Sequence, residues 1–554
     1  MNLTILLLGV NARYIHSSLP LYYLKQILQP LNYTVYLHET TINQPVDDTR
    51  NAIVTINPDV LCLSVYIWNA TYIKKLLPMV HTALPNCIII LGGPEVSYTA
   101  DEWLKHFPFI TTIVQGAGER SFEYAAQKQF LLDTKTVSLP NYHLNEIPFP
   151  YSESDINNVA SRFIYYESSR GCPYACSYCI SSREDQSIQF RDLSKVYAEL
   201  DIFLQHRVRM VKFVDRTFNC NPTHARSIFY YLLSHNNNHT HFHFEIHPDL
   251  LFDEDFTLLQ QVPKNYFQFE IGIQSIHPKT LSSINRKMNW EQAKENIAKL
   301  MELNTIHIHL DMICGLPYED IEAIKESFNE IIELKPHYFQ MGFLKILPGT
   351  KIASQKNEFG IEHDAEAPYT VIKNNWIPGH MMQALHCIER VVDRFYNHHF
   401  KTTWMMLCHF ITSGDSFKSF EMIAQFFYKK NFVLFAKDWE AIATMILTFI
   451  KEEYPPVEEL AIDCLRWDWF IQSNSKWVPA CVRSKTNPNI VKEIIINNHK
   501  IAKDELLLDG KRIPVRTIQH AQIFIAESKT FQQWHMAGHH YAIKLHRDTI
   551  LYSA

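Results

Sequence analysis

The stretch that decides the fold is Arg170-Gly171-Cys172-Pro173-Tyr174-Ala175-Cys176-Ser177-Tyr178-Cys179. Its three cysteines have the spacing C-x3-C-x2-C and come directly after a short apolar run. Three thiolates on one loop can hold three irons of a four-iron, four-sulfur cluster, and the lack of a fourth cysteine leaves one iron open to another ligand. Two alternatives are a zinc site, which needs paired cysteine arms with a fourth ligand, and three buried structural cysteines. The spacing favours the cluster over both.

Strand-like runs on the C-terminal side of the motif alternate with helical patterns such as Ser194–Gln205. The runs are Phe163–Glu167, Met210–Asp215, His241–His247, Tyr266–Gln274, His307–Cys314 and Tyr338–Ile346. Strands that alternate with helices predict parallel pairing, and six such units predict a partial (βα)6 barrel over residues 161–350. The chemistry of such a barrel lies at the carboxyl ends of its strands.

A second alternation of strands and helices precedes the motif, in residues 1–135. Its apolar runs are Leu3–Val10, Thr34–His38, Val60–Ile67, Cys87–Leu91 and Ile110–Val114. This order predicts an α/β domain with a doubly wound parallel sheet, which binds ligands at the carboxyl ends of its strands. Residues 136–160 are rich in Pro, Asn and Ser and are interpreted as a linker.

Residues 351–554 change to long, aromatic-rich helical stretches, such as 381–409 and 417–427, followed by a mixed tail that includes 492–496 and 522–525. This pattern predicts a mainly helical C-terminal domain, and no chemical motif stands out in it. Its aromatic side chains either cap the open barrel and help to define the substrate, or belong to an ordinary packed core.

Composition excludes several classes of protein. Hydrophobic residues make up 47% of the 554 residues and charged residues 20%, so each domain can bury a core and long-range disorder is excluded. A net charge of −6 gives no support for a nucleic-acid or membrane-surface partner. No basic leader precedes the N-terminal apolar run, and the run is too short to span a bilayer. The 11 cysteines are scattered along the chain and do not form a dense secreted framework. We therefore expect a cytoplasmic protein without a membrane anchor.

The cysteine motif, with the aromatic Tyr178 before its last cysteine, resembles the signature of the radical S-adenosylmethionine (SAM) superfamily. In that family the open iron binds the amino and carboxylate groups of SAM, and an electron from the cluster cleaves SAM to methionine and a 5′-deoxyadenosyl radical. The resemblance implies that Cys172, Cys176 and Cys179 are the catalytic ligands of a [4Fe–4S] cluster. It also implies SAM as cofactor and an external electron donor such as flavodoxin or ferredoxin.

The same resemblance assigns SAM contacts to polar residues at or near successive barrel strand ends: Asp215, Glu245, Gln274, Arg286 and Asp311. Asp215 would accept from the SAM ammonium, although the family has a more glycine-rich segment there and a helix cap or ion pair remains an alternative. Glu245 would hold the ribose hydroxyls, and Gln274 would contact SAM. Arg286 would pair with the methionyl carboxylate, and Asp311 would reach the adenosine or order Arg286.

An α/β domain ahead of such a barrel resembles the cobalamin-binding group of radical SAM proteins, over roughly residues 1–350. In that group the loops after strands three to five cradle the corrin tail. The matching residues here are Ser64, Gly92, Gly93, Gly116, Gly118 and Glu119. Glycines permit close backbone approach to a bulky ligand. The D-x-H-x-x-G motif of cobalamin mutases is absent, and His16 in the first loop either faces the corrin or makes a local hydrogen bond.

Residues from about 375 onward resemble an uncharacterised C-terminal extension found in one bacterial subgroup, together with the segments 11–16 and 214–219. The resulting hypothesis is a cobalamin-dependent radical SAM methyltransferase that acts on an unactivated carbon of an unknown small-molecule or peptide substrate. One alternative is a rearrangement or cyclisation in which cobalamin donates no methyl group. Another is a corrinoid- and cluster-binding sensor without turnover. Methylthiolation of tRNA would need extra cluster cysteines and a basic module that do not stand out here.

Overall fold

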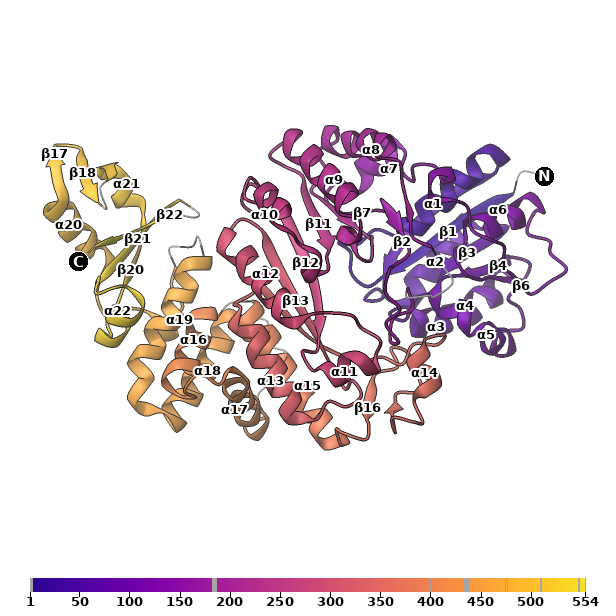
Figure 1. Cartoon of the computed structure of the whole chain (residues 1–554). Coiled ribbons are helices and arrows are strands. Elements are labelled where there is room, and N and C mark those ends of the chain that lie inside the picture. The colour runs from indigo at the N-terminus through magenta and orange to yellow at the C-terminus, as the bar shows by residue number, and fades with distance from the viewer. Residues whose placement is uncertain are drawn as a thin grey trace. The chain divides into compact units, whose positions relative to one another are not determined.

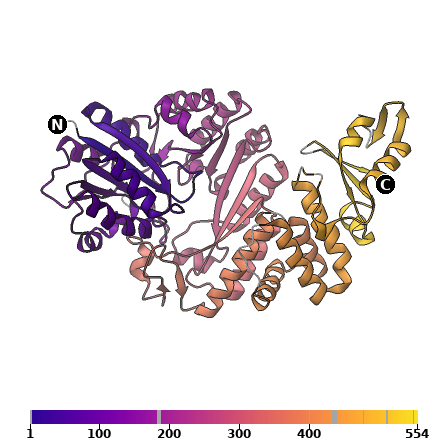
Figure 2. The same ribbon diagram turned by 180° about the vertical axis from the view of Figure 1, so that it is seen from behind.

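The computed structural model describes residues 3–181, 187–398, 400–431, 438–473, 475, 477–508, 511–546 and 549–553. The chain divides into two compact units (Figures 1 and 2). The first comprises residues 1–327, 333–337 and 341–382 and contains both predicted α/β domains. The second comprises residues 328–332, 338–340 and 383–554. Within the described residues, no helix is long and apolar enough to cross a membrane.

The N-terminal domain is built on a parallel sheet with the strand order β2-β1-β3-β4-β5-β6. The strands are β1 (Thr4–Asn11), β2 (Thr34–Thr41), β3 (Val60–Ser64), β4 (Ile88–Gly92), β5 (Thr112–Val114) and β6 (Thr136–Val137). The prediction of a doubly wound parallel sheet is confirmed. β6 lies in the stretch interpreted as linker, because two residues are too few to show a strand pattern. β3 ends at Ser64, three residues earlier than the sequence indicates.

Helices cover both faces of this sheet, as Figure 1 shows. On β1, Ile5 and Leu7 pack toward α1 (Leu19–Leu28) and α6 (Glu119–Gln127). The alternate side chains of β1 pack on the other face with α2 (Val46–Ile56), α3 (Ala70–Ala83) and α5 (Ala100–His106). Because both faces are buried, the strands are almost continuously apolar, and the polar residues lie in the loops at the ends of the strands.

The second domain is the predicted partial barrel. Its sheet has the order β14-β13-β12-β11-β10-β7, and the pairs from β7 to β13 are parallel. The strands are β7 (Phe163–Tyr166), β10 (Met210–Phe213), β11 (His241–Glu245), β12 (Phe267–Gln274), β13 (His307–Cys314) and β14 (Tyr338–Phe343). The intervening helices are α8 (Leu193–Gln205), α9 (Pro222–Ser234), α10 (Asp253–Leu259), α11 (Pro278–Ser283), α12 (Trp290–Leu303) and α13 (Ile321–Glu333).

The two faces of the barrel sheet differ in chemistry. Phe213, Phe244 and Phe269 are buried together with Phe229 of α9, so this face of the sheet packs against the helices. Strand alternation then places Lys212, His243, Glu245, Glu270 and His309 on the opposite face, inside the barrel. Barrel interiors are usually filled by branched apolar side chains. A lumen lined by charged side chains indicates that this barrel holds a polar ligand.

The C-terminal region is mainly helical, as predicted. Its helices are α15 (Gly379–Val392), α16 (Lys401–Phe410), α17 (Ser416–Lys429), α18 (Trp439–Glu453), α19 (Glu458–Gln472), α20 (Pro488–His499), α21 (Val515–His520) and α22 (Lys529–His535). The long helical stretch expected at 381–409 is interrupted by a π-helical turn at Asp393–Asn397. The tail adds two three-stranded antiparallel sheets, β17–β19 (within 500–514) and β20–β22 (within 522–553). Residues 492–496 lie in α20.

The backbone of Val65 packs closely against Gly93, and this contact gives a prediction about stability. Gly93 has φ +107, and a Cβ atom there would lie 2.6 Å from the carbonyl oxygen of Val65. We expect Gly93→Ala to lower the free energy of unfolding of the cofactor-free chain by about 2 kcal/mol or more. Urea unfolding followed by circular dichroism measures this. Gly118→Ala is the control, because its Cβ would make an ordinary 3.5 Å contact with Val114. Equal losses in the two variants would contradict the strain at Gly93.

Candidate functional site

The cysteine loop begins at a two-residue strand, β8 (Ser169–Arg170), which pairs with β9 (Gln189–Phe190) in antiparallel fashion. Gly171 follows with φ +102, and a Cβ there would lie 3.3 Å from the backbone of Ile188. A side chain at Gly171 would therefore be strained and crowded. Glycine at this position lets the chain turn sharply out of β8 into the cysteines.

Backbone hydrogen bonds fix the loop to the segment that follows α11. The amide of Ser177 donates to the Ile284 carbonyl at 2.8 Å, and the side-chain amide of Asn285 donates to the Ala175 carbonyl at 2.9 Å. The Arg286 guanidinium lies 4.0 Å from the Cys176 sulfur. Burial raises the pKa of the Cys176 thiol, and the Arg286 charge opposes that rise. The guanidinium thus favours the thiolate that iron requires.

The other two cysteines have polar neighbours at the second strand end of the barrel. The Cys172 sulfur lies 3.6 Å from the Thr217 hydroxyl. The charge of Glu245 raises the pKa of the Arg216 guanidinium, burial opposes the rise, and Cys179 and Cys172 are close enough to add to it. No group of three or more His, Cys, Asp or Glu side chains among the described residues is placed to hold a single metal ion. In a four-iron cluster each cysteine binds a different iron, so the three-thiol donor set fits that group.

Gln274 occupies a strained position at the end of β12. Its φ is +74, and the register of β12 against β13 shifts between Gly272 and Gln274. Its Oε1 atom is buried and has no hydrogen-bond partner within the described part of the chain. Strained backbone and an unsatisfied acceptor are features of ligand sites. The position therefore fits the predicted contact with SAM.

Arg286 lies beside Gln274, as the sequence predicts for two residues that bind one cofactor. Its Nε donates to the Ile273 carbonyl at 3.3 Å, and its Nη2 donates to the Gly272 carbonyl. A Cβ at Gly272 would meet the Gln274 amide nitrogen and approach Arg286. The absence of a side chain at Gly272 thus makes room for both polar groups next to Cys176.

Asp215 is placed differently from the other predicted SAM residues. Its side chain is buried, and its carboxylate accepts hydrogen bonds from the Ser168 amide at 3.0 Å, the Ser168 hydroxyl at 2.6 Å and the Ser169 hydroxyl at 2.7 Å. Burial raises the pKa of Asp215 to about 6, against these hydrogen bonds. These contacts are neither a helix cap nor an ion pair; they tie Asp215 to the segment just before the cysteine motif, and its contact with SAM stays a prediction.

Glu245 lies at the end of β11, 3.5 Å from the guanidinium of Arg216. Burial in the barrel raises the pKa of its carboxyl to about 7, and Arg216 opposes the rise. Hydroxyl donors from a ribose would stabilise the ionised form of this carboxyl. Asp311, on β13, pairs with His309 at 2.9 Å, so its expected role in ordering Arg286 stays a prediction.

The predicted corrin-tail residues come together in one cavity of about 430 Å³ in the N-terminal domain. Ser64, Gly92, Gly93, Gly116, Gly118 and Glu119 all line it. A Cβ at Gly116 would point into open space, so the backbone itself forms part of the wall. The cavity is also lined by Arg170 and Arg216 from the barrel. A bare glycine wall permits the close approach of a bulky nucleotide-like ligand.

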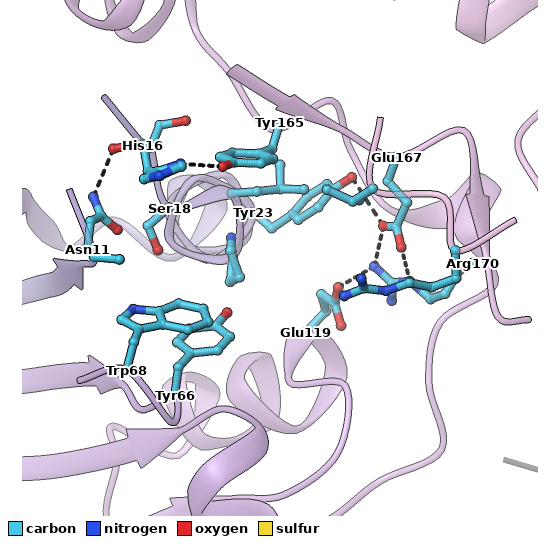
Figure 3. A pocket seen from close by; sticks show the side chains of 16 residues that line it. Asn11, His16, Ser18, Tyr23, Tyr66, Trp68, Glu119, Tyr165, Glu167 and Arg170 are labelled. Atoms are coloured by element: carbon cyan, nitrogen blue, oxygen red, sulfur yellow. Dashed lines mark hydrogen bonds and ion pairs between the residues drawn. The ribbon is translucent and has the colours of Figure 1, made fainter. Parts of the chain in front are cut away.

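A second cavity of about 470 Å³ shares Tyr66, Glu119 and Arg170 with the first (Figure 3). Figure 3 shows the rings of Tyr66 and Trp68 on one side, and His16 with Tyr165 on the opposite side. Tyr66 and Trp68 stack with centroids 4.2 Å apart. His16 lines this cavity, and its Nδ1 is 2.6 Å from the hydroxyl of Tyr165 on β7, so its partner is distant in sequence and not local. Burial lowers the pKa of His16, and its contact with the corrin stays a prediction. Aromatic walls suit a large planar ring.

Several residues of the site escape sequence reasoning. Arg216 adjoins the predicted Asp215 and carries the contacts with Glu245 and the cysteine loop. Tyr66 lies in the run Val60–Ile67 that the sequence assigns to a strand, and Trp68 directly follows that run; the two aromatic residues after an apolar stretch were a visible signal. Glu319, fully buried, accepts from the Ser275 hydroxyl at 2.7 Å and so supports the strained end of β12.

Comparison with known families accounts for both domains. Residues 5–126 match the B12 binding domain, and residues 166–331 match the radical SAM superfamily. The chain therefore contains a B12-binding domain followed by a radical SAM domain. Residues 357–534 match a family described as a protein of unknown function (DUF4080). The matches confirm the two predicted domains and, with them, the cofactors that these domains imply: a [4Fe–4S] cluster, SAM and cobalamin.

Relatives of this chain include the cobalamin-dependent radical SAM methyltransferase TokK of Streptomyces tokunonensis, which is 24% identical over 55% of this chain and 49% of TokK. The 2-(S-pantetheinyl)-carbapenam-3-carboxylate methyltransferase of Streptantibioticus cattleyicolor is 22% identical over 53% of this chain and 48% of its own length. The chain thus spans about half the length of these relatives.

The fold is similar to that of the cobalamin-dependent SAM radical enzyme OxsB, whose structure was solved with aqua-cobalamin and SAM bound. The TM-score is 0.58 at 14% identity, and the similarity covers 84% of this chain and 78% of OxsB. At this identity the likeness concerns the fold.

Glu319 yields a pH-dependent prediction. Burial raises the pKa of its carboxyl to about 8, from an ordinary value of 4.5. Between these values the unfolded chain loses the proton while the folded chain keeps it, so the free energy of unfolding falls as pH rises. Since each pKa unit corresponds to about 1.4 kcal/mol, we expect a loss on the order of 3 kcal/mol.

Urea unfolding of the cofactor-free chain at pH 5 and pH 8.5 measures this loss, and Glu319→Gln should remove most of it. Glu322→Gln is the matched control, because the Glu322 side chain is 76% exposed. A Glu319→Gln variant with the wild-type pH slope would show that this carboxyl does not titrate as its burial requires.

Proposed function

We propose that this chain is a cobalamin-dependent methyltransferase that acts on an unactivated carbon. One observation carries the proposal: the cavity formed by the glycine loops of the B12-binding domain is also lined by Arg170 and Arg216. Arg170 precedes Cys172 by two residues, and Arg216 precedes Thr217, which touches the Cys172 sulfur. The corrinoid pocket and the cluster loop are therefore neighbouring parts of one active site.

Different residues would bind the cluster and SAM. Cys172, Cys176 and Cys179 would hold the cluster, with SAM placed by Gln274 and Arg286 beside Cys176. When bound, the cluster and SAM supply an organic radical, and cobalamin supplies a methyl group that can be transferred. The chain itself contributes orientation of these groups and exclusion of water.

The polar barrel lumen is the region in which a substrate would lie. His243 Nε2 is 3.0 Å from the Glu270 carboxylate. Burial lowers the pKa of the Lys212 ammonium, and the charge of Glu270 opposes this fall. These groups lie on strands whose carboxyl ends carry the SAM residues. The proposed substrate is therefore a small molecule or peptide segment with polar groups near the reacting carbon. An external one-electron donor, such as flavodoxin or ferredoxin, would reduce the cluster.

The proposal is tested by anaerobic reconstitution with iron, sulfide and hydroxocobalamin, followed by metal analysis and chromatography of SAM products after dithionite. We expect about four irons per chain, about one cobalt, and both 5′-deoxyadenosine and S-adenosylhomocysteine. 5′-Deoxyadenosine without S-adenosylhomocysteine would favour the rearrangement or cyclisation alternative. Binding of both cofactors without any SAM cleavage would favour the sensor.

The cysteine assignment has its own prediction. We expect the Cys172→Ala, Cys176→Ala and Cys179→Ala triple variant to lose the cluster and all SAM cleavage, because the irons lose their only thiolate ligands in the motif. Cys220→Ala is the matched control, since Cys220 lies outside the motif, in the short 3₁₀ turn Phe218–Cys220 that follows β10, and this variant should keep its iron. Iron analysis and the absorbance of the cluster measure both. Iron retained by the triple variant would refute the assignment.

A further prediction concerns Glu245 and SAM. We expect Glu245→Gln to weaken SAM binding to the reconstituted protein about 10-fold, because a neutral amide replaces a carboxylate that accepts from two hydroxyls. Equilibrium dialysis with labelled SAM measures the affinity. Glu302→Gln, an exposed position on α12, should leave it unchanged. An unchanged affinity in Glu245→Gln would place the ribose elsewhere.

A further inference from the structure

Arg170 is held by two carboxylates that come from different domains. Its Nη2 lies 2.7 Å from Glu119 Oε1 and 2.7 Å from Glu167 Oε2, and its Nε donates to Glu167 Oε1 at 2.9 Å. The three side chains are 19%, 11% and 12% exposed, so these ion pairs are shielded from solvent. Shielded, forked pairs of this kind are strong and fix geometry.

The two ends of this link belong to the two cofactor sites. Glu119 is the first residue of α6 and follows Gly116-Ala117-Gly118, the loop that lines the corrin-tail cavity. Arg170 ends β8 and is joined to Cys172 through Gly171 alone. A shift of either loop must therefore move the guanidinium or break an ion pair.

The guanidinium also has a donor that no group of the described chain uses. Arg170 Nη1 is buried and has no hydrogen-bond partner within the described part of the chain. Arg170 lines both cavities together with Glu119 and Glu167, and Figure 3 shows the three side chains at one end of the second cavity. An unsatisfied buried donor is costly, so a ligand that accepts from Nη1 would gain from its presence.

Domain docking alone does not account for this arrangement. The N-terminal domain is already joined to the segment before the barrel by Lys25 and Asp155 at 2.6 Å, and to the start of β7 by Glu39 and Arg162 at 2.8 Å. The Lys25–Asp155 pair lines neither of the two cavities. It therefore provides a comparison that separates docking from a role at the cofactors.

We propose that Arg170 is a positioning residue that couples corrinoid binding to the cluster loop. Glu119 and Glu167 hold the guanidinium, so that Nη1 meets an acceptor group of the corrinoid when the cysteine loop is ordered. Each cofactor then binds more tightly when the other is present, since coupling between sites is reciprocal. The inference rests on the proposed function, because it takes both cofactors as partners of one site.

The experiment measures hydroxocobalamin affinity by equilibrium dialysis, with the full chain either stripped of iron or reconstituted with the cluster. In the wild-type protein we expect the cluster to tighten binding by about 5-fold or more. Glu119→Gln and Arg170→Gln should bring the ratio of the two affinities close to one. Arg170→Lys keeps the positive charge but loses the forked hydrogen bonds of the guanidinium, and should give an intermediate ratio.

Lys25→Met is the control for docking. It should leave the ratio at the wild-type value even if the affinity falls in both states. The reciprocal readout is the rate at which a chelator removes iron, which hydroxocobalamin should slow in the wild-type protein but not in Glu119→Gln.

A wild-type ratio of one, or an unchanged ratio in both Glu119→Gln and Arg170→Gln, would overturn the coupling while leaving the proposed function intact. A wild-type protein that binds no hydroxocobalamin in either state would overturn both.

Discussion

The structure depends on how the cysteine loop is fixed before any cofactor binds. Gly171 turns the chain out of β8, and the amide of Ser177 and the carbonyl of Ala175 are tied to the Ile284–Arg286 segment. Three thiols on a free loop would lose much conformational entropy on binding a cluster. Here the loop loses that entropy during folding, before a cluster binds. The hydrogen bonds that order the loop also bring Arg286 to Cys176.

The same site carries features that lower stability. Gln274 has a left-handed backbone and an unsatisfied acceptor, and Glu319 keeps a buried carboxyl beneath it. The barrel lumen holds charged side chains where an apolar core would be more stable. Such costs are expected where binding groups must be placed in advance of their ligand. The aromatic face formed by Phe213, Phe244 and Phe269 provides the compensating core.

Much of this organisation could be predicted from the sequence, because its strongest signals are local. The spacing of three cysteines predicts the cluster loop, and alternating apolar runs predict the strands of both sheets apart from β6, with β13 at its observed limits. Glycines are few in the chain, so their clusters at residues 92–93 and 116–118 indicated a binding edge that the structure places in one cavity.

What escaped prediction depends on contacts between distant segments. The link from Arg170 to Glu119 joins residues 51 positions apart, and Arg216 acquires its role only because β10 ends beside the cysteine loop. β6 consists of two residues, and the strained turn at Gln274 has no local signature. The account is tested most directly by electron paramagnetic resonance of protein that holds both the reduced cluster and cob(II)alamin. Neighbouring sites predict signals broadened or split by mutual interaction, whereas two unperturbed signals would contradict a shared active site.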